Sequence, residues 1–308
     1  MAYRGQTHIN KALSNISVKY RNNEFIADQL LKTIPVKKES DVYYIYNKDQ
    51  KIPDTLRGNG SPSNMHQWEV STASYALNEH ALSDIVTDRD RENSDTIAVD
   101  VTSTEMLTDK ILLRQEYEAS ALLFTTGSWT NNETILTATS WDYDAGTATS
   151  LPIKDVLEGY SSIVSNSGVA PNIMAMGWET FAVLKENQNV YSRIQYVEKA
   201  LITSDLLASI FDVEKVVVGK SVYDSADDGL AAVTGYIWGP DALLAYINPN
   251  MGLKQVTAAS KLALNSGYKT KKWRREELSG DQIEVSTMFD MKVVCDNCGY
   301  FFKNCNES

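Results

Sequence analysis

Residues 47–67 read NKDQKIPDTLRGNGSPSNMHQ, and the segments on either side, at 42–46 and about 68–77, both have the composition of β-strands. The stretch contains two prolines, two glycines, charges of both signs and almost nothing suited to a core. Hairpin strands are usually joined by short connections. A structureless loop of this length indicates a functional arm, a disordered segment or a mistaken assignment of the flanking strands.

The composition of the chain limits the other function classes. At 308 residues it can bury a substantial core in one large domain or two ordinary ones. The net charge of −11 disfavours sequence-specific recognition of nucleic acid, which needs a positive surface, but it is compatible with enclosing nucleic acid. We expect no membrane association, because no apolar run approaches the ~20 residues of a membrane span.

The segment VVVGKS at 216–221 has some likeness to a phosphate-binding loop. Such a loop needs a second glycine five residues before Gly219, and that position is Glu214, whose charge would repel phosphate. The residues that follow also make a poor helix start, so the usual anion-binding helix N-terminus is missing. We interpret the segment as the end of a strand followed by a turn.

Cys295, Cys298 and Cys305 lie within the last fourteen residues with the spacing Cys-x2-Cys-x6-Cys. The odd number argues against a disulfide framework, and a structural zinc would lack a fourth ligand because no histidine lies nearby. Free thiols near a strand end are the main interpretation, and a metal site shared between chains is the alternative.

Other candidates for chemistry are weaker still. DRDREN at 88–93 lacks the glycine and the distal glutamate of a calcium loop. None of the histidines accompanies a recognisable nucleophile. The sequence therefore predicts no catalytic residue, no cofactor and no metal site, and we expect a protein that is not an enzyme.

Apolar residues at helical spacing predict one long helix over about 98–124, with Ser103 or Thr104 as its N-cap. We expect a short helix and a charged turn over 78–93. The polar region 125–150 is expected to be irregular.

Helix and strand patterns alternate through residues 151–254. Beyond them, apolar Ile283, Val285 and Phe289 alternate with polar residues, which predicts a long strand with one solvent-facing side. This strand is expected to pair in a hairpin with the charged segment before it. Together these elements indicate an α+β protein.

In this order the segments resemble the major capsid proteins of tailed bacteriophages with the Hong Kong 97 fold. The resemblance extends along nearly the whole chain. It is most specific at residues 16–49 together with 55–86, which look like the arm and extension loop of such proteins, and at 167–196, which look like the strand and helix of their axial domain.

The resemblance implies a Hong Kong 97-type capsid fold with an N-terminal arm, an extended β-hairpin loop, a long spine helix, and peripheral and axial domains. Carried over by segment, the expected divisions are an arm at 1–41, the extension loop at 42–77, a peripheral domain at 78–150 with 255–308 including a spine helix at about 98–124, and an axial domain at 151–254.

The implied function is a major capsid protein that assembles as hexamers and pentamers into the icosahedral head shell around the double-stranded DNA genome. The implied localisation is the virion, after assembly in the host cytoplasm. Portal and scaffolding proteins are the implied partners, and a decoration protein stays open. Many relatives carry a cleaved N-terminal scaffolding segment, so a separate scaffold and the removal of such a segment would each fit.

Within that interpretation, contacts between subunits are expected from the extension loop and the arm. The expected residues are Tyr20, Arg21, Tyr43, Tyr44, Tyr46, Lys48, Lys51, Arg57 and Trp68, with Asp88, Asp90 and Glu92 as charge partners on a neighbour. Covalent crosslinking through Lys48 or Lys51 is not expected. The alternatives are an encapsulin-like compartment that encloses protein cargo and an α/β enzyme whose long loop is an active-site lid.

Overall fold

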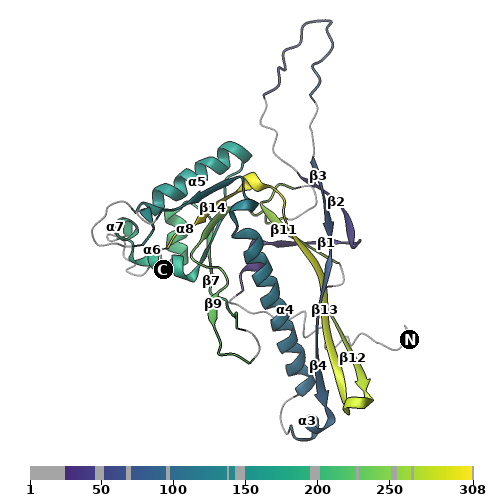
Figure 1. Cartoon of the computed structure of the whole chain (residues 1–308). Helices are drawn as coiled ribbons and strands as arrows, with labels where there is room; N and C mark the ends of the chain where they lie inside the picture. The colour runs from purple at the N-terminus through teal and green to yellow at the C-terminus, as the bar shows by residue number, and fades with distance from the viewer. Residues whose placement is uncertain are drawn as a thin grey trace.

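The structure is a computed structural model that describes most of the chain (Figure 1). The described residues are 25–45, 52–66, 71–94, 98–136, 139–142, 150–194, 202–226, 229–250, 255–264 and 267–306. They form two five-stranded sheets, two two-stranded sheets and a set of helices. The expected α+β class is confirmed.

The first sheet is built around the long strand β13 (Gly280–Val293). Residues 280–286 pair antiparallel with β12 (Lys269–Arg275) on one side, and residues 280–289 pair antiparallel with β4 (Asn78–Thr87) on the other. The second half of β13 pairs antiparallel with β11 (Ala259–Leu264), and β1 (Lys32–Val36) adds in parallel to β11. The expected long strand and terminal hairpin are confirmed, and Ile283, Val285 and Phe289 are buried. The expected solvent-facing side is wrong, because no residue of β13 is exposed and Ser286 and Thr287 are buried where β13 pairs with β4.

The short helix expected over 78–93 is wrong for most of its length. Strand β4 occupies ten of these residues because every one of them has an antiparallel partner on β13. A helix begins only at α3 (Asp88–Glu92). There Thr87 accepts a hydrogen bond from the Asp90 backbone N–H, and the Asp90 side chain accepts one from the Thr87 backbone, which is the reciprocal arrangement of a capping box.

The expected long helix is α4 (Val99–Leu123), whose 25 residues span about 37 Å. It packs against β13 and β4 and runs from α3 toward the second sheet (Figure 1). The expected N-cap is wrong, because the helix begins after Ala98 without a side-chain cap. Ser103 and Thr104 lie inside the helix, where the Ser103 hydroxyl donates to Asp84 and the Thr104 hydroxyl donates to the Asp100 carbonyl.

The second sheet has the strand order β5-β14-β10-β6-β7. Its strands are β5 (Asn131–Thr134), β14 (Gly299–Lys303), β10 (Ala242–Ala245), β6 (Ile173–Gly177) and β7 (Lys215–Gly219). Two of them, β5 and β14, come from the ranges expected for the peripheral domain. They share a sheet with strands of residues 151–254, because β14 pairs with β10 and β5 pairs with β14.

Four helices accompany this sheet: α5 (Pro152–Ser167), α6 (Trp178–Glu186), α7 (Gln188–Ile194) and α8 (Ser204–Ile210). A small hairpin, β8 (Val222–Asp224) with β9 (Thr234–Tyr236), follows β7. Three short 3₁₀ turns are η1 (Thr126–Ser128), η3 (Glu276–Leu278) and η4 (Asp296–Cys298). Within the described ranges, none of the helices combines the length and the apolar character needed to cross a bilayer.

The expectation of an irregular region over 125–150 is wrong in its described part. This part contains η1 and β5, and it buries Trp129 and Trp141 in the two main core clusters. Two buried tryptophans anchor a polar segment because each contributes a large apolar area. The many Thr and Ser residues led to the expectation of an irregular segment, although the two tryptophans are buried.

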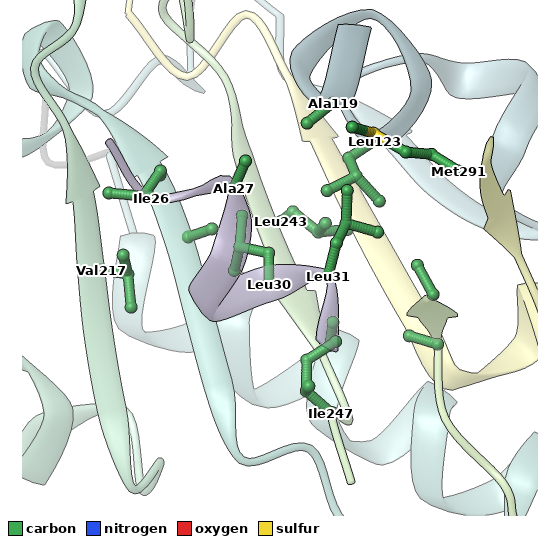
Figure 2. Packing of buried hydrophobic residues seen from close by; sticks show 14 of the residues in the cluster. Ile26, Ala27, Leu30, Leu31, Ala119, Leu123, Val217, Leu243, Ile247 and Met291 are labelled. Carbon is green, nitrogen blue, oxygen red and sulfur yellow. The ribbon is translucent and has the colours of Figure 1, made fainter. Parts of the chain in front are cut away.

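Helix α2 (Ala27–Leu30) fills the space between the two sheets (Figure 2). Ile26, Ala27, Leu30 and Leu31 are buried in one cluster with residues of both sheets and of α4. Figure 2 labels the partners Ala119, Leu123, Val217, Leu243, Ile247 and Met291. The described part of the expected arm, from residue 26 through β1, therefore belongs to the body of the subunit.

The second sheet also depends on a close approach at Gly177, the last residue of β6. A Cβ atom there would lie 1.8 Å from the Gly239 carbonyl oxygen. We predict that Gly177→Ala lowers the free energy of unfolding by about 3 kcal/mol, because backbone atoms must move to admit the methyl group. Denaturant unfolding of the subunit measures this value.

The matched control for this prediction is Gly127→Ala, where an added Cβ meets nothing within 4 Å and φ is not positive. Its unfolding midpoint should stay close to that of the wild type. Equal midpoints for the two variants would contradict the close approach at Gly177.

Candidate assembly interface

The expected extension loop rises from a two-stranded sheet of its own. Strand β2 (Ser40–Ile45) pairs antiparallel with β3 (Ser71–Ala76), from Ser40 opposite Ala76 to Ile45 opposite Ser71. Residues 52–66 lie farther from the body than these strands, at the end of the molecule opposite to α3 (Figure 1). The hairpin in this segment is confirmed.

The base of the hairpin is held by the chain itself. Tyr43 and Tyr75 are buried in a small cluster with Ile34 and Val36 of β1 and with Leu262 of β11. Beside them, the backbone N–H of Ala76 donates a hydrogen bond of 3.1 Å to Asp290 on β13. The first sheet therefore sets the direction in which the hairpin leaves the body.

Residues 52–66 form neither helix nor strand, but hydrogen bonds within the segment shape it. The Arg57 Nε–H donates to the Ser61 carbonyl at 2.6 Å, and the Ser61 hydroxyl donates to the Gly58 carbonyl at 2.8 Å. The Asn64 side-chain amide donates to the Asp54 carbonyl at 2.9 Å and joins the two sides. Gly60 has a φ of +82°, which a residue with a side chain rarely adopts, so it permits the turn.

Three apolar side chains of this loop are almost fully exposed: Ile52 at 96%, Leu56 at 87% and Met65 at 91%. Single exposed apolar side chains are common on protein surfaces, but three on one protruding loop are available for contact with another surface. None of the three is among the contact residues expected from the sequence, because polar residues dominate the loop. The sequence feature that could have identified them is the presence of single apolar residues within a long polar segment.

The structure separates the expected contact residues into three groups. Tyr44, 46% exposed, and Arg57 lie on the accessible surface. Tyr43 is only 7% exposed and is packed inside its own subunit, so the expectation of an intersubunit contact does not hold for most of its side chain. The remaining expected residues, Tyr20, Arg21, Tyr46, Lys48, Lys51 and Trp68, lie outside the described part of the chain.

The expected acidic partner surface on α3 is largely neutralised within the subunit. Asp88 accepts two hydrogen bonds from Arg274, at 2.6 and 2.5 Å, and this guanidinium lowers the pKa of the Asp88 carboxyl. The Asp90 carboxylate accepts hydrogen bonds from the backbone N–H and the hydroxyl of Thr87, the N-cap of α3. Glu92 is exposed and is the member of the trio best placed for a neighbour.

The surroundings of Asp88 explain why no acidic patch forms there. Arg91 bonds to Asp100 at 2.9 Å and to Asp281 at 2.8 Å. Lys272 bonds to the same two carboxylates. With Asp88 and Arg274, three acids face three bases, so this end of the molecule presents a balanced ion network.

The buried carboxylate of Glu116, in the middle of α4, fixes the start of the described chain. It accepts hydrogen bonds from the backbone N–H groups of Ile26 at 2.7 Å and Ala27 at 2.9 Å. It also accepts one from the indole N–H of Trp238 at 2.8 Å. The spine helix, α2 and the segment before β10 therefore meet at one side chain.

Two opposing effects act on the pKa of the Glu116 carboxyl, and the effect of burial is the larger. Burial raises this pKa, and the three N–H donors oppose that shift by favouring the charged form. The adjacent Gln115 donates to Asp28 at 2.9 Å, and Asp28 also pairs with Lys261 of β11 at 2.6 Å. These bonds extend the same anchor into the first sheet.

Comparisons with known proteins agree with this architecture. No protein-family model matches the chain. A major capsid protein of Burkholderia phage BcepMu is 28% identical over 252 residues, which cover 81% of this chain and 80% of the relative.

Two solved structures have the same fold. A phage-related protein from Bordetella bronchiseptica RB50 superposes with a TM-score of 0.79 at 18% identity, over 97% of this chain and 98% of the other. The capsid of cyanophage P-SCSP1u has a TM-score of 0.61 at 12% identity, over 92% and 89%. The chain has the Hong Kong 97-type capsid fold, as expected, and its relatives in sequence are phage major capsid proteins.

We predict that Glu116→Ala lowers the free energy of unfolding by about 3 kcal/mol, because it leaves buried donors on Ile26, Ala27 and Trp238 without their acceptor. Denaturant unfolding of the subunit measures the change. The matched control is Glu118→Ala, two residues further on, whose carboxylate pairs with Arg114 near the surface. The control should cost less than about 1 kcal/mol, and a similar cost for both variants would contradict the role of Glu116.

Proposed function

We propose that this chain is the major capsid protein of a tailed bacteriophage, forming the shell that encloses the double-stranded DNA. The observation that carries the proposal is likeness to a phage major capsid protein over 81% of the chain in sequence, together with a capsid fold along almost the whole chain. In the proposed particle, subunits form hexamers and pentamers that close an icosahedral head. The role is structural rather than catalytic.

The extension loop supplies the proposed contact between subunits. Its hairpin base is held by the chain's own core, while Ile52, Leu56 and Met65 are left uncovered. A neighbouring subunit would bury these three side chains, at about 1.5–3 kcal/mol for each side chain fully covered. Because a shell repeats each contact many times, modest interfaces are sufficient to hold it together.

Charged and aromatic groups would add orientation to this contact. Tyr44 and Arg57 are accessible on the hairpin and its loop, and Glu92 is accessible on α3 at the opposite end of the subunit. An Arg57–Glu92 pairing between neighbours would set the register more than the strength of the contact. The same role is proposed for Lys48, Lys51 and the arm residues Tyr20 and Arg21.

Further partners follow from the proposed role. A phage head needs a portal vertex and a scaffold to reach the correct size, and a decoration protein would add to the outer surface. Assembly would take place in the host cytoplasm, and the finished protein would be a component of the virion. The net charge of −11 suits a shell that must hold DNA without binding it tightly.

The contents of purified particles distinguish this proposal from an encapsulin-like compartment. Particles released from infected cells should contain double-stranded DNA that is protected from nuclease. Particles that instead enclose one enzyme and no genome would overturn the head proposal while leaving the shell fold intact.

We predict that deletion of residues 50–64 leaves the subunit folded and abolishes closed shells. The described loop residues hydrogen-bond mainly to one another, so the deletion removes no core contact of β2 and β3. Circular dichroism and denaturant unfolding should change little, within about 0.5 kcal/mol. Sedimentation and negative-stain imaging should find no shells, and normal shells from this variant would refute the role of the loop.

A single side chain gives a sharper test of the same contact. We predict that Leu56→Ser raises the subunit concentration needed for assembly by about tenfold or more, because a buried contact worth about 2 kcal/mol is lost in the shell. The free energy of unfolding of the subunit should not change, since the side chain is exposed there. Leu56→Met keeps an apolar side chain and should assemble like the wild type; failure of both variants alike would contradict an apolar contact.

A further inference from the structure

The short turn that joins the two large sheets contains two cysteines whose sulfur atoms touch. Cys295 follows the end of β13, and Cys298 directly precedes β14. The Cys298 thiol donates to the Cys295 sulfur at an Sγ–Sγ distance of 2.8 Å. Two thiols so close on one four-residue turn are placed to react with each other.

The backbone holds both cysteines in position. The N–H of Cys295 donates to the Ala258 carbonyl at 3.2 Å, and the Cys298 carbonyl accepts from the N–H of Tyr246 at 2.9 Å. Within the turn, the N–H of Cys298 donates to the Cys295 carbonyl at 3.2 Å. Just beyond it, an added Cβ at Gly299 would lie 2.4 Å from the Trp129 ring, so the chain has little room to shift.

The two thiols are chemically unequal. The hydrogen bond from Cys298 lowers the pKa of the Cys295 thiol, against the opposing effect of burial. The same bond and burial raise the pKa of Cys298. Cys295 is thus the sulfur that more readily becomes the thiolate, which is the reactive form of cysteine.

Cys305 is set apart from this pair. It belongs to the core cluster around Trp141 and Phe302, whereas Cys295 and Cys298 belong to the cluster between the sheets. Its own thiol donates to the Phe302 carbonyl at 3.5 Å. Among the residues the structure describes, no three Cys, His, Asp or Glu side chains gather in a way that could hold a metal ion.

We propose that Cys295 and Cys298 are a modification site, a dithiol that a small peroxide converts reversibly into a disulfide across the turn between the two sheets. Both sulfurs are buried, so the oxidant must be as small as hydrogen peroxide. The disulfide would link Cys295, just before η4, to Cys298, just before β14. It would thereby restrain the turn that connects the two sheets.

The reaction balances in two steps. The Cys295 thiolate attacks one peroxide oxygen, the O–O bond breaks, and the departing hydroxide takes a proton to become water, leaving a sulfenic acid on Cys295. The Cys298 sulfur then attacks the Cys295 sulfur, the S–O bond breaks, and the second hydroxide leaves as water with the Cys298 proton. Two thiols lose two hydrogen atoms, and peroxide is reduced to two waters.

Tryptic cleavage at lysines separates the cysteine pair from Cys305, so the oxidation state of the pair can be measured by mass spectrometry. Trypsin cleaves after Lys292 and Lys303, so Cys295 and Cys298 fall on peptide 293–303 while Cys305 falls on peptide 304–308. The folded wild-type chain is treated with hydrogen peroxide, quenched with catalase, unfolded with an excess of an alkylating reagent, and digested. We expect peptide 293–303 to be unalkylated and about 2 Da lighter than its dithiol form, and dithiothreitol to restore alkylation.

Two variants are the controls. Cys305→Ser should give the same oxidised peptide, since Cys305 takes no part. Cys298→Ser should lose the 2 Da product and accumulate sulfenic acid on Cys295, which dimedone labels. The proposal is overturned if both cysteines of peptide 293–303 stay alkylatable after peroxide, if Cys305 is found in the bond, or if the bond joins two chains on a non-reducing gel.

Discussion

The buried carboxylate of Glu116 is the constraint on which the arrangement of the subunit depends. A carboxylate with no solvent is costly unless donors surround it, and here the backbone of α2 and the indole of Trp238 supply them. Once the chain is held at Ile26, the apolar side chains of α2 fill the space between the two sheets. Strand β1 follows α2 directly and pairs with β11, so the start of β2 is held against the first sheet. The extension loop leaves the body from this position.

The extension loop, in contrast to the buried region around Glu116, is stabilised by few contacts within its own chain. Its strands are secured at the base by Tyr43 and Tyr75, but residues 52–66 are exposed and are shaped by local hydrogen bonds. A two-stranded hairpin is marginal in water by itself. A rigid base with an adaptable end suits a part whose remaining contacts come from another copy of the subunit.

The sequence was most informative where one periodicity is strong and long. The alternation of Ile283, Val285 and Phe289 predicted β13, and helical spacing predicted α4. It failed for β4, because Leu82 and Ile85 are exposed on a strand whose pairing is set by a partner two hundred residues away. Burial of Glu116, Trp129 and Trp141, and the joining of β14 to β10, likewise depend on contacts distant in sequence. For the candidate interface, the loop and Arg57 were predicted, while the ion pairs that occupy Asp88 were not visible before the fold.

Strand β12 has a consequence for the specificity of self-association. It lies at an edge of the first sheet, where unpaired backbone groups can recruit a strand from another molecule. Five of its seven residues are basic, namely Lys269, Lys271, Lys272, Arg274 and Arg275. Most of these side chains pair with acids of the same chain, because Lys271 bonds to Glu284, Lys272 to Asp100 and Asp281, Arg274 to Asp88 and Arg275 to Glu277. A strand added at this edge would have to pack against charged side chains that are already held in ion pairs, and this disfavours open-ended strand pairing between copies. The charged side chains of β12 therefore protect this edge of the sheet against the strand-to-strand pairing that leads to fibres.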